Sequence, residues 1–212
     1  YATYLERMVE RKKVEVDSLL RRHNSEDDPL VMRMSYMASE NLYNVTKSLQ
    51  IQNDNDDDGD VRRLSVLVDL KRRSPTVRDR PSVVEFNNAP KFAELLALAG
   101  SDAFLVNTDD VEYGGRYDDL KACSDHVRLN TAPDKHPPAC IYKDIIIHPV
   151  QIAQALDKGA AGVLLIAAVV GADLEVLLDA CTIMGVEAVV EVRTLTGITN
   201  HNPNPNSNPN HH

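Results

Sequence analysis

The chemistry that this sequence could carry begins at a short apolar stretch, residues 66–70, that runs into the cluster Lys71-Arg72-Arg73. Side chains alternate between faces along a strand, so Asp69 and Lys71 would share a face with Leu67. An acid and a base are costly in the middle of a helix-covered sheet and tolerable at its carboxyl end, where α/β proteins bind ligands. The pair is a candidate acid–base site. The alternative is a solvated ion pair at a strand end.

Three further stretches that read as strands also end in polar chemistry. The residues concerned are Asn107, Lys143 and Glu191, which alternate with Leu105, Ile141 and Val189. A single polar residue at a strand end is ordinarily a solvated terminus. Together with Asp69 and Lys71, however, these residues collect at the carboxyl ends of separate strands. Convergence on one rim is typical of a barrel active site.

Strand and helix patterns alternate through the main body of the chain. The predicted strands are 64–70, 103–107, 139–143, 162–168 and 187–192, and the predicted helices between them are 88–99, 117–127, 149–158 and 173–184. The period is roughly 30 residues, as parallel βαβ units require. Such alternation predicts an α/β protein whose parallel sheet is covered by helices.

The rest of the chain flanks this body. We predict an N-terminal helical extension over 1–50, with an amphipathic helix at 2–23 and a second apolar stripe at 30–49, then an acidic loop at 51–63, a partial barrel at 64–197 and a disordered Asn/Pro/His tail at 198–212. The loop is too polar to pack, and the repeated Asn-Pro steps of the tail are incompatible with helix and strand. We therefore expect one folded body, 64–197, and one helical extension.

Composition limits the partners. The net charge of −9 and the pI near 5.2 argue against nucleic acid as the main partner, because nucleic acid is usually bound by a basic patch. No apolar run reaches the roughly 20 residues that span a bilayer, and we expect no signal peptide and no membrane. Three separated cysteines and the scattered histidines match neither a disulfide framework nor a metal site. We expect a soluble protein of a reducing compartment, the cytoplasm, or a plastid in a photosynthetic eukaryote.

Five motifs follow one another in order. They are Asp69-Leu70-Lys71-Arg72-Arg73-Ser74-Pro75-Thr76, Thr108-Asp109 with Tyr113-Gly114-Gly115 and Asp118 to Leu120, Lys143-Asp144-Ile145-Ile146-Ile147-His148-Pro149-Val150-Gln151-Ile152, Ala160-Ala161-Gly162-Val163-Leu164-Leu165-Ile166-Ala167-Ala168 and Val190-Glu191-Val192. They resemble the motifs E-x-K-x-x-S-P-S, T-D-x-x-x-F-G-G-S-x-x-D-L, K-D-F-I-I-D-P-Y-Q-I, G-A-D-A-V-L-L-I-A-A and V-E-V-H of the indole-3-glycerol phosphate synthase family of tryptophan biosynthesis. The resemblance extends from about residue 2 to about residue 196.

The resemblance implies a TIM (β/α)8 barrel family, represented here by an incomplete barrel of about five βα units with an N-terminal helical extension. It also implies a carboxy-lyase that acts on a small anionic phosphorylated substrate without metal or nucleotide cofactor. By carry-over, Lys143 is the general acid, Glu191 the general base, and Asp69 the residue that positions the reacting groups. Lys71 would bind the substrate carboxylate or phosphate and share the acid role, and Ser74 and Asn107 would help to bind substrate.

The sequence also departs from the family pattern. Asp69 replaces a glutamate and is one methylene shorter, and Ile145 replaces an aromatic residue that packs on the substrate. The family motifs of strands six to eight, which include its phosphate contacts, do not occur in these 212 residues. We therefore expect a fragment or truncated form of a synthase, with little activity alone.

Two other interpretations stay open. The chain could be a non-catalytic remnant that acts as a binding or oligomerisation module through open sheet edges. It could also be another barrel enzyme of phosphorylated sugars, such as phosphoribosylanthranilate isomerase, but that family lacks both the N-terminal helices and the K-D motif.

Overall fold

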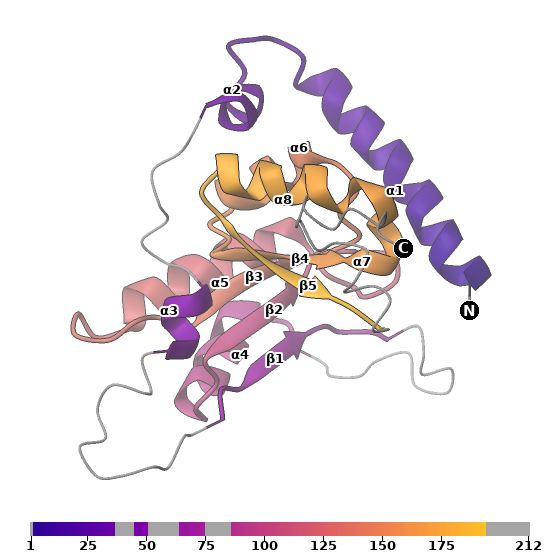
Figure 1. The fold of residues 1–212 in the computed structure, drawn as a ribbon. Coiled ribbons are helices and arrows are strands. Elements are labelled where there is room, and N and C mark those ends of the chain that lie inside the picture. The colour runs from indigo at the N-terminus through magenta and orange to yellow at the C-terminus, as the bar shows by residue number, and fades with distance from the viewer. Residues whose placement is uncertain (1, 37–44, 51–63, 75–85, 194–212) are drawn as a thin grey trace, which may run out of the picture.

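The computed structural model describes residues 2–36, 45–50, 64–74 and 86–193, and these contain a five-stranded parallel sheet (Figure 1). Its strands are β1 (Leu67–Leu70), β2 (Ala103–Asn107), β3 (Ala139–Lys143), β4 (Gly162–Ile166) and β5 (Glu187–Glu191), hydrogen-bonded in sequence order. This all-parallel, sequential order is the one that consecutive βα units of a barrel produce. The predicted acidic loop at 51–63 and tail at 198–212 lie outside the described residues.

Helices separate the strands and pack on one side of the sheet. They are α4 (Ala89–Leu98), α5 (Tyr117–Asn130), α6 (Pro149–Asp157), the short α7 (Ala167–Val170) with the 3₁₀ turn η2 (Gly171–Asp173), and α8 (Leu174–Ile183). The predicted strand at 162–168 is two residues too long, because the chain turns into α7 directly after Ile166. No helix within the described ranges is long and apolar enough to cross a membrane.

The N-terminal extension forms three helices: α1 (Ala2–Arg22), α2 (Pro29–Ser35) and α3 (Val45–Gln50). The stripe predicted at 30–49 is therefore not one helix, since Tyr36 has an extended backbone with φ −115° and ψ 133°. Packing explains the break. Helix α2 contacts α6 and α8 on the helix-covered side of the sheet, whereas α3 contacts β2 and β3 on the opposite side (Figure 1). One straight helix could not make both contacts.

The sheet has two apolar faces, and their residues follow the predicted alternation. Val68, Leu70, Ala188 and Val190 pack with the helices in the larger core. The opposite, inner face carries a smaller cluster made of Val45, Ala103, Ala139, Ile141, Ala161, Leu164 and, partly buried, Leu49, Leu105 and Val189. Asp69, Asn107, Lys143 and Glu191 belong by alternation to this inner face.

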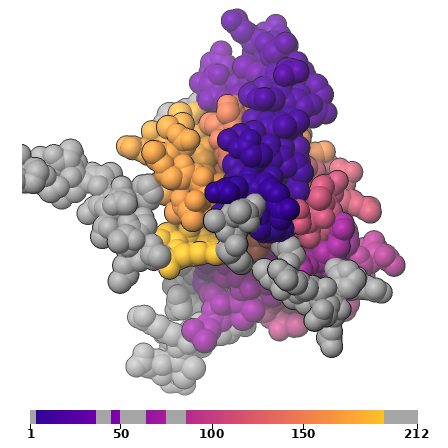
Figure 2. Space-filling view, turned by 90° about the vertical axis from the view of Figure 1, so that its right-hand side faces the viewer, coloured from indigo at the N-terminus to yellow at the C-terminus, as the bar shows by residue number. Residues whose placement is uncertain are grey.

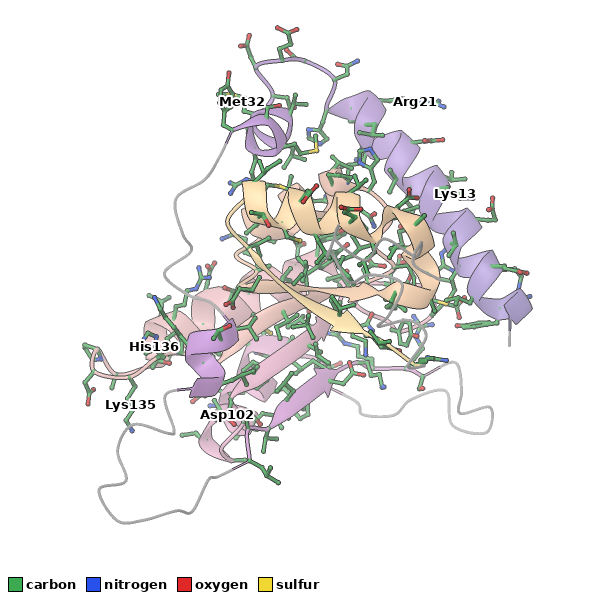
Figure 3. The ribbon with its side chains drawn as sticks, viewed as in Figure 1. Lys13, Arg21, Met32, Asp102, Lys135 and His136 are labelled. Atoms are coloured by element: carbon green, nitrogen blue, oxygen red, sulfur yellow. The ribbon has the colours of Figure 1, made fainter. Side chains whose placement is uncertain are left out.

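Helix α3 closes the amino end of the inner face. The Ser48 hydroxyl donates to the carbonyl of Asp102 at 2.6 Å and accepts from the amide of Ala139 at 3.0 Å. Asp102 in turn accepts from the amide of Val66 at 2.6 Å and lies beside the amino end of β2 (Figure 3). Helix α3 thus covers the amino ends of β2 and β3. The polar residues at the carboxyl ends of the strands lie at the opposite rim of the sheet.

Candidate active site

The centre of the candidate site is one carboxylate that holds two lysines. Asp69 Oδ2 accepts hydrogen bonds from Lys71 Nζ at 2.7 Å and from Lys143 Nζ at 2.8 Å. The three side chains are 20–27% exposed, so they reach solvent at the carboxyl ends of β1 and β3. Two ammonium groups against one carboxylate leave an excess of one positive charge. This cluster, Asp69-Lys71-Lys143, can bind an anion and can donate a proton.

Asn107 lies between the two strands that bear the lysines. It is paired with Lys143 in the β2–β3 register and is 2% exposed. Its side-chain oxygen accepts a hydrogen bond from the Asp109 amide at 3.3 Å. Among the described contacts, the Asn107 side chain therefore stabilises the turn after β2. Ser74 is half-buried in the segment that follows β1. Substrate binding by Asn107 and by Ser74 stays a prediction.

Glu191 is on the same rim but apart from the cluster. The β3–β4 pairing of Tyr142 with Val163, extended by one residue, puts Lys143 level with Leu164, whose β5 partner is Val189. Glu191 is two residues further along β5 on the same face, and its side chain is 37% exposed. Its carboxylate accepts from Arg193 at 3.3 Å, and no ion pair in the described part of the chain joins it to Lys143.

Beside this cluster is a buried ion pair that the sequence reasoning missed. Asp144 follows Lys143 directly and pairs with Lys12 of α1 at 2.9 Å, and both side chains are almost fully buried. Asp144 also accepts from the Thr108 hydroxyl at 2.9 Å and from the Ile145 amide at 2.7 Å. Burial raises the pKa of the Asp144 carboxyl, and the Lys12 ammonium opposes that shift. A sequence signal existed, because Lys12 interrupts the apolar stripe of α1.

Two further side chains of α1 bind the loop after β2. Arg11 pairs with Asp109 at 2.6 Å and with Glu112 at 3.1 Å, and the Tyr4 hydroxyl donates to Glu112 at 2.6 Å. In Figure 2, α1 runs over the face of the molecule between the orange residues of α7 and α8 and the pink residues of the middle of the chain. Charge therefore fastens α1 beside the carboxyl ends of β2 and β3.

The Tyr113-Gly114-Gly115 motif joins the loops that follow β1 and β2. The Tyr113 carbonyl accepts from the amides of both Arg72 and Arg73, and Gly114 takes a φ of +69°. A Cβ on Gly115 would lie 2.0 Å from the Asn107 carbonyl oxygen, so only glycine lets the loop come this close to β2. The motif thus holds the segment after Lys71 against the end of β2.

Arg72 strengthens the same junction. Its guanidinium pairs with both carboxylate oxygens of Asp119, at 2.6 and 3.1 Å, and stacks 4.3 Å from the Phe86 ring centre. A bidentate, stacked arginine is fixed in orientation, which lysine could not reproduce. Although Arg72 is next to Lys71 in the sequence, its contacts thus give it a structural role.

His148 begins α6 and makes a pH-dependent cap. Its Nδ1 accepts from the Val150 amide at 3.1 Å, while Gln151 Oε1 accepts from the His148 amide at 3.1 Å. The Nδ1 bond requires an unprotonated nitrogen, and burial lowers the pKa of His148 below its ordinary value near 6.5. The unfolded chain therefore takes up the proton first as the pH falls.

We expect the stabilisation from this cap to be complete above pH 6.5 and to be lost as the pH falls from there towards the lowered pKa of folded His148. His148→Asn keeps an oxygen acceptor for the helix and cannot titrate. When the pH falls from 7.5 to 5.5, the free energy of unfolding of this variant should therefore decrease by about 1 kcal/mol less than that of the native chain. Urea unfolding at both pH values measures the difference. Equal losses in the two proteins would contradict this account of the cap.

Comparison with known proteins identifies the family. A protein-family model described as indole-3-glycerol phosphate synthase matches residues 5–200. The chain belongs to this family. Its five parallel strands and the helices between them are thus part of a TIM-barrel architecture, and the predicted fold class is confirmed. The Asp69-Lys71-Lys143 cluster lies at the carboxyl ends of the strands, which is where TIM-barrel enzymes have their active sites.

Curated indole-3-glycerol phosphate synthases match the chain in part. The relative from Opitutus terrae is 34% identical over 131 residues, which cover 61% of this chain and 46% of the relative. The relative from Staphylococcus aureus is 30% identical over 153 residues, or 70% of this chain and 54% of the relative. The chain spans about half the length of the curated relatives that it matches.

Proposed function

We propose that the Asp69-Lys71-Lys143 cluster, with Glu191, forms the acid–base part of an indole-3-glycerol phosphate synthase active site. The observation that carries the proposal is the single Asp69 carboxylate that binds lysines from two strands at 2.7 and 2.8 Å. The substrate would be 1-(2-carboxyphenylamino)-1-deoxyribulose 5-phosphate, whose carboxylate and phosphate suit the excess positive charge. The product would be indole-3-glycerol phosphate.

The reaction needs one ring closure and two eliminations. The ring carbon that bears the carboxylate attacks the ketone carbon, and Lys143 donates a proton to the ketone oxygen as the new bond forms. Loss of carbon dioxide returns the electron pair to the aromatic ring. Glu191 then removes a proton while an ammonium group protonates the departing hydroxyl, which leaves as water. Lys71 would hold the substrate anion and share that acid role, and Asp69 would orient both lysines.

A chimera tests the proposal. Residues 5–193, which keep Lys12 with Asp144, replace the matching segment of the Opitutus terrae relative, and the relative supplies the remaining βα units of the barrel. We expect this chimera to convert the substrate, with indole fluorescence as the readout. A chimera that unfolds cooperatively and shows native circular dichroism, yet does not turn over substrate, would contradict the proposal.

A second candidate function is self-association through the end strands of the described sheet. Beside β1, Val66 is 45% exposed and Leu67 39% exposed, and beside β5 Val192 is 36% exposed. Exposed apolar edge strands favour pairing with another chain. We expect the 212-residue chain to sediment as a dimer or larger at micromolar concentration, and Leu67→Lys to shift it towards monomer. A native chain that sediments as a monomer at about 100 µM would exclude this function, because a dimer with a Kd of about 1 µM would be mostly associated at that concentration.

The cysteines support the proposed compartment. Cys123, Cys140 and Cys181 are free and buried, and burial raises the pKa of each thiol, to about 12 for Cys123 and Cys181. Such thiols are unreactive side chains of the core. All three cysteines of the chain are free, and because disulfides are rare in reducing compartments we propose the cytoplasm or a plastid.

A further inference from the structure

Helix α1 carries a lysine in the middle of its buried stripe. Met8, Val16 and Leu19 are 2–6% exposed, and Lys12, which lies between them at helical spacing, is 5% exposed. A lysine buried at such a position is costly unless a partner charge meets it. Asp144 is that partner, at 2.9 Å, and Glu15 of the same helix binds the ammonium at 2.6 Å. The Lys12–Asp144 ion pair can form at only one position of α1 along its own axis. The pair therefore fixes where α1 lies relative to the sheet and its helices.

Asp144, the partner of Lys12, is connected to the candidate catalytic residue Lys143. Asp144 is the next residue in the chain, and its carboxylate binds the Ile145 amide and the Thr108 hydroxyl. The Thr108 amide donates in turn to the Lys143 carbonyl at 3.1 Å. The Lys143 carbonyl and the backbone that follows it are therefore held by groups that converge on Asp144. The Lys143 side chain leaves this fixed backbone to reach Asp69.

Open hollows flank α1 where it lies on the body. Hollows of about 400 and 430 Å³ lie along it, one lined by Lys12, Tyr117 and Gln151 and the other by Lys13, His148 and Asp173. The buried Lys12–Asp144 ion pair acts beside the buried apolar side chains Met8, Val16 and Leu19 in holding α1 in place. A shift of α1 would therefore move Asp144 through its ion pair with Lys12.

We propose that Lys12 is a positioning residue for Lys143, and that it acts through Asp144. Helix α1 is then part of the support of the active site, although it lies outside the barrel. The importance of this support for catalysis rests on the proposed function, but the arrangement itself does not. Loss of the Lys12 charge frees Asp144 from its place, which loosens the turn after β3 and draws Lys143 away from Asp69.

The test observes Lys143 directly in the 212-residue chain. Lysines are labelled with ¹³C at Cε and ¹⁵N at Nζ, and the Lys143 signal is identified by its loss in Lys143→Arg. Asp69→Asn supplies the signal of a Lys143 that has lost its carboxylate. We expect Lys12→Met to move the Lys143 signal by at least half of the displacement caused by Asp69→Asn, and Lys12→Arg to restore most of it.

Lys13→Met is the matched control. Lys13 is the next residue of α1, is exposed, and pairs only with Glu10 among the described residues (Figure 3). A Lys143 signal in Lys12→Met that coincides with the signal in Lys13→Met would overturn the proposal, even if the melting temperature of Lys12→Met falls. A role limited to stability would lower the melting temperature without moving this signal.

A second variant keeps the proposal testable if Lys12→Met does not fold. Asp144→Asn removes the charge that Lys12 binds but keeps an oxygen for the Ile145 amide. The same displacement of the Lys143 signal is expected, and its absence would overturn the proposal. No turnover enters either measurement, so a failed synthase assay and a failed positioning role give different results.

Discussion

Lys143→Ala in the chimera should lower kcat by about 100-fold or more. Lys143 donates to Asp69 at the carboxyl end of β3, and alanine leaves no group there that can protonate the ketone oxygen. The fold should survive, because the side chain is partly exposed and its loss opens no cavity in the core. Steady-state kinetics with the synthetic substrate measures the effect.

The control for this variant is Lys121→Ala. Lys121 lies on α5, is 53% exposed and pairs only with Asp125 among the described residues, so its loss should change kcat less than twofold. A Lys143→Ala chimera that turns over at the rate of the Lys121→Ala control would remove Lys143 from the mechanism. The catalytic role would then pass to Lys71, the other ammonium on Asp69.

Lys12→Met should lower the free energy of unfolding of the 212-residue chain by about 3–5 kcal/mol. Methionine fills much of the lysine volume, so the loss comes from the Asp144 carboxylate, which stays buried without its cation. Urea unfolding followed by circular dichroism measures the change. Lys13→Met, one residue along the helix and exposed, should stay within about 0.5 kcal/mol of the native chain.

The double variant Lys12→Met/Asp144→Asn separates the charge from the packing. Asparagine is neutral and still accepts from the Ile145 amide, so the double variant should recover most of the stability that Lys12→Met loses. A double variant that is as unstable as the sum of the two single changes would show that the ion pair does not couple the two sites. The register of α1 would then depend on apolar packing alone.

The strands, their order and their faces could be predicted because alternation is a local property. Alternation alone separates Val189 and Glu191 from Ala188 and Val190, and the structure places Val189 in the inner cluster and Ala188 and Val190 in the helix-side core. The same local logic put Asp69 and Lys143 on one rim, where they meet. It could not show that Glu191 lies apart from them, because the stagger between β3 and β5 is a property of the whole sheet.

Long-range partners were beyond reach of the sequence. Lys12 and Asp144 lie 132 positions apart, and although the apolar stripe of α1 marks Lys12 as unusual, no local pattern identifies Asp144 as its partner. The break of the second apolar stripe at Tyr36 has the same origin, since α2 and α3 pack on opposite sides of the sheet. Tertiary packing overrode local periodicity in both cases.

A crystal structure of the chimera with indole-3-glycerol phosphate bound would test the central claim most directly. We predict that the product lies at the carboxyl ends of the strands, with Lys143 Nζ and Lys71 Nζ within hydrogen-bond distance of it and Glu191 facing it across the rim. Product bound at another place, or Lys143 and Glu191 turned outward among the helices, would contradict the account.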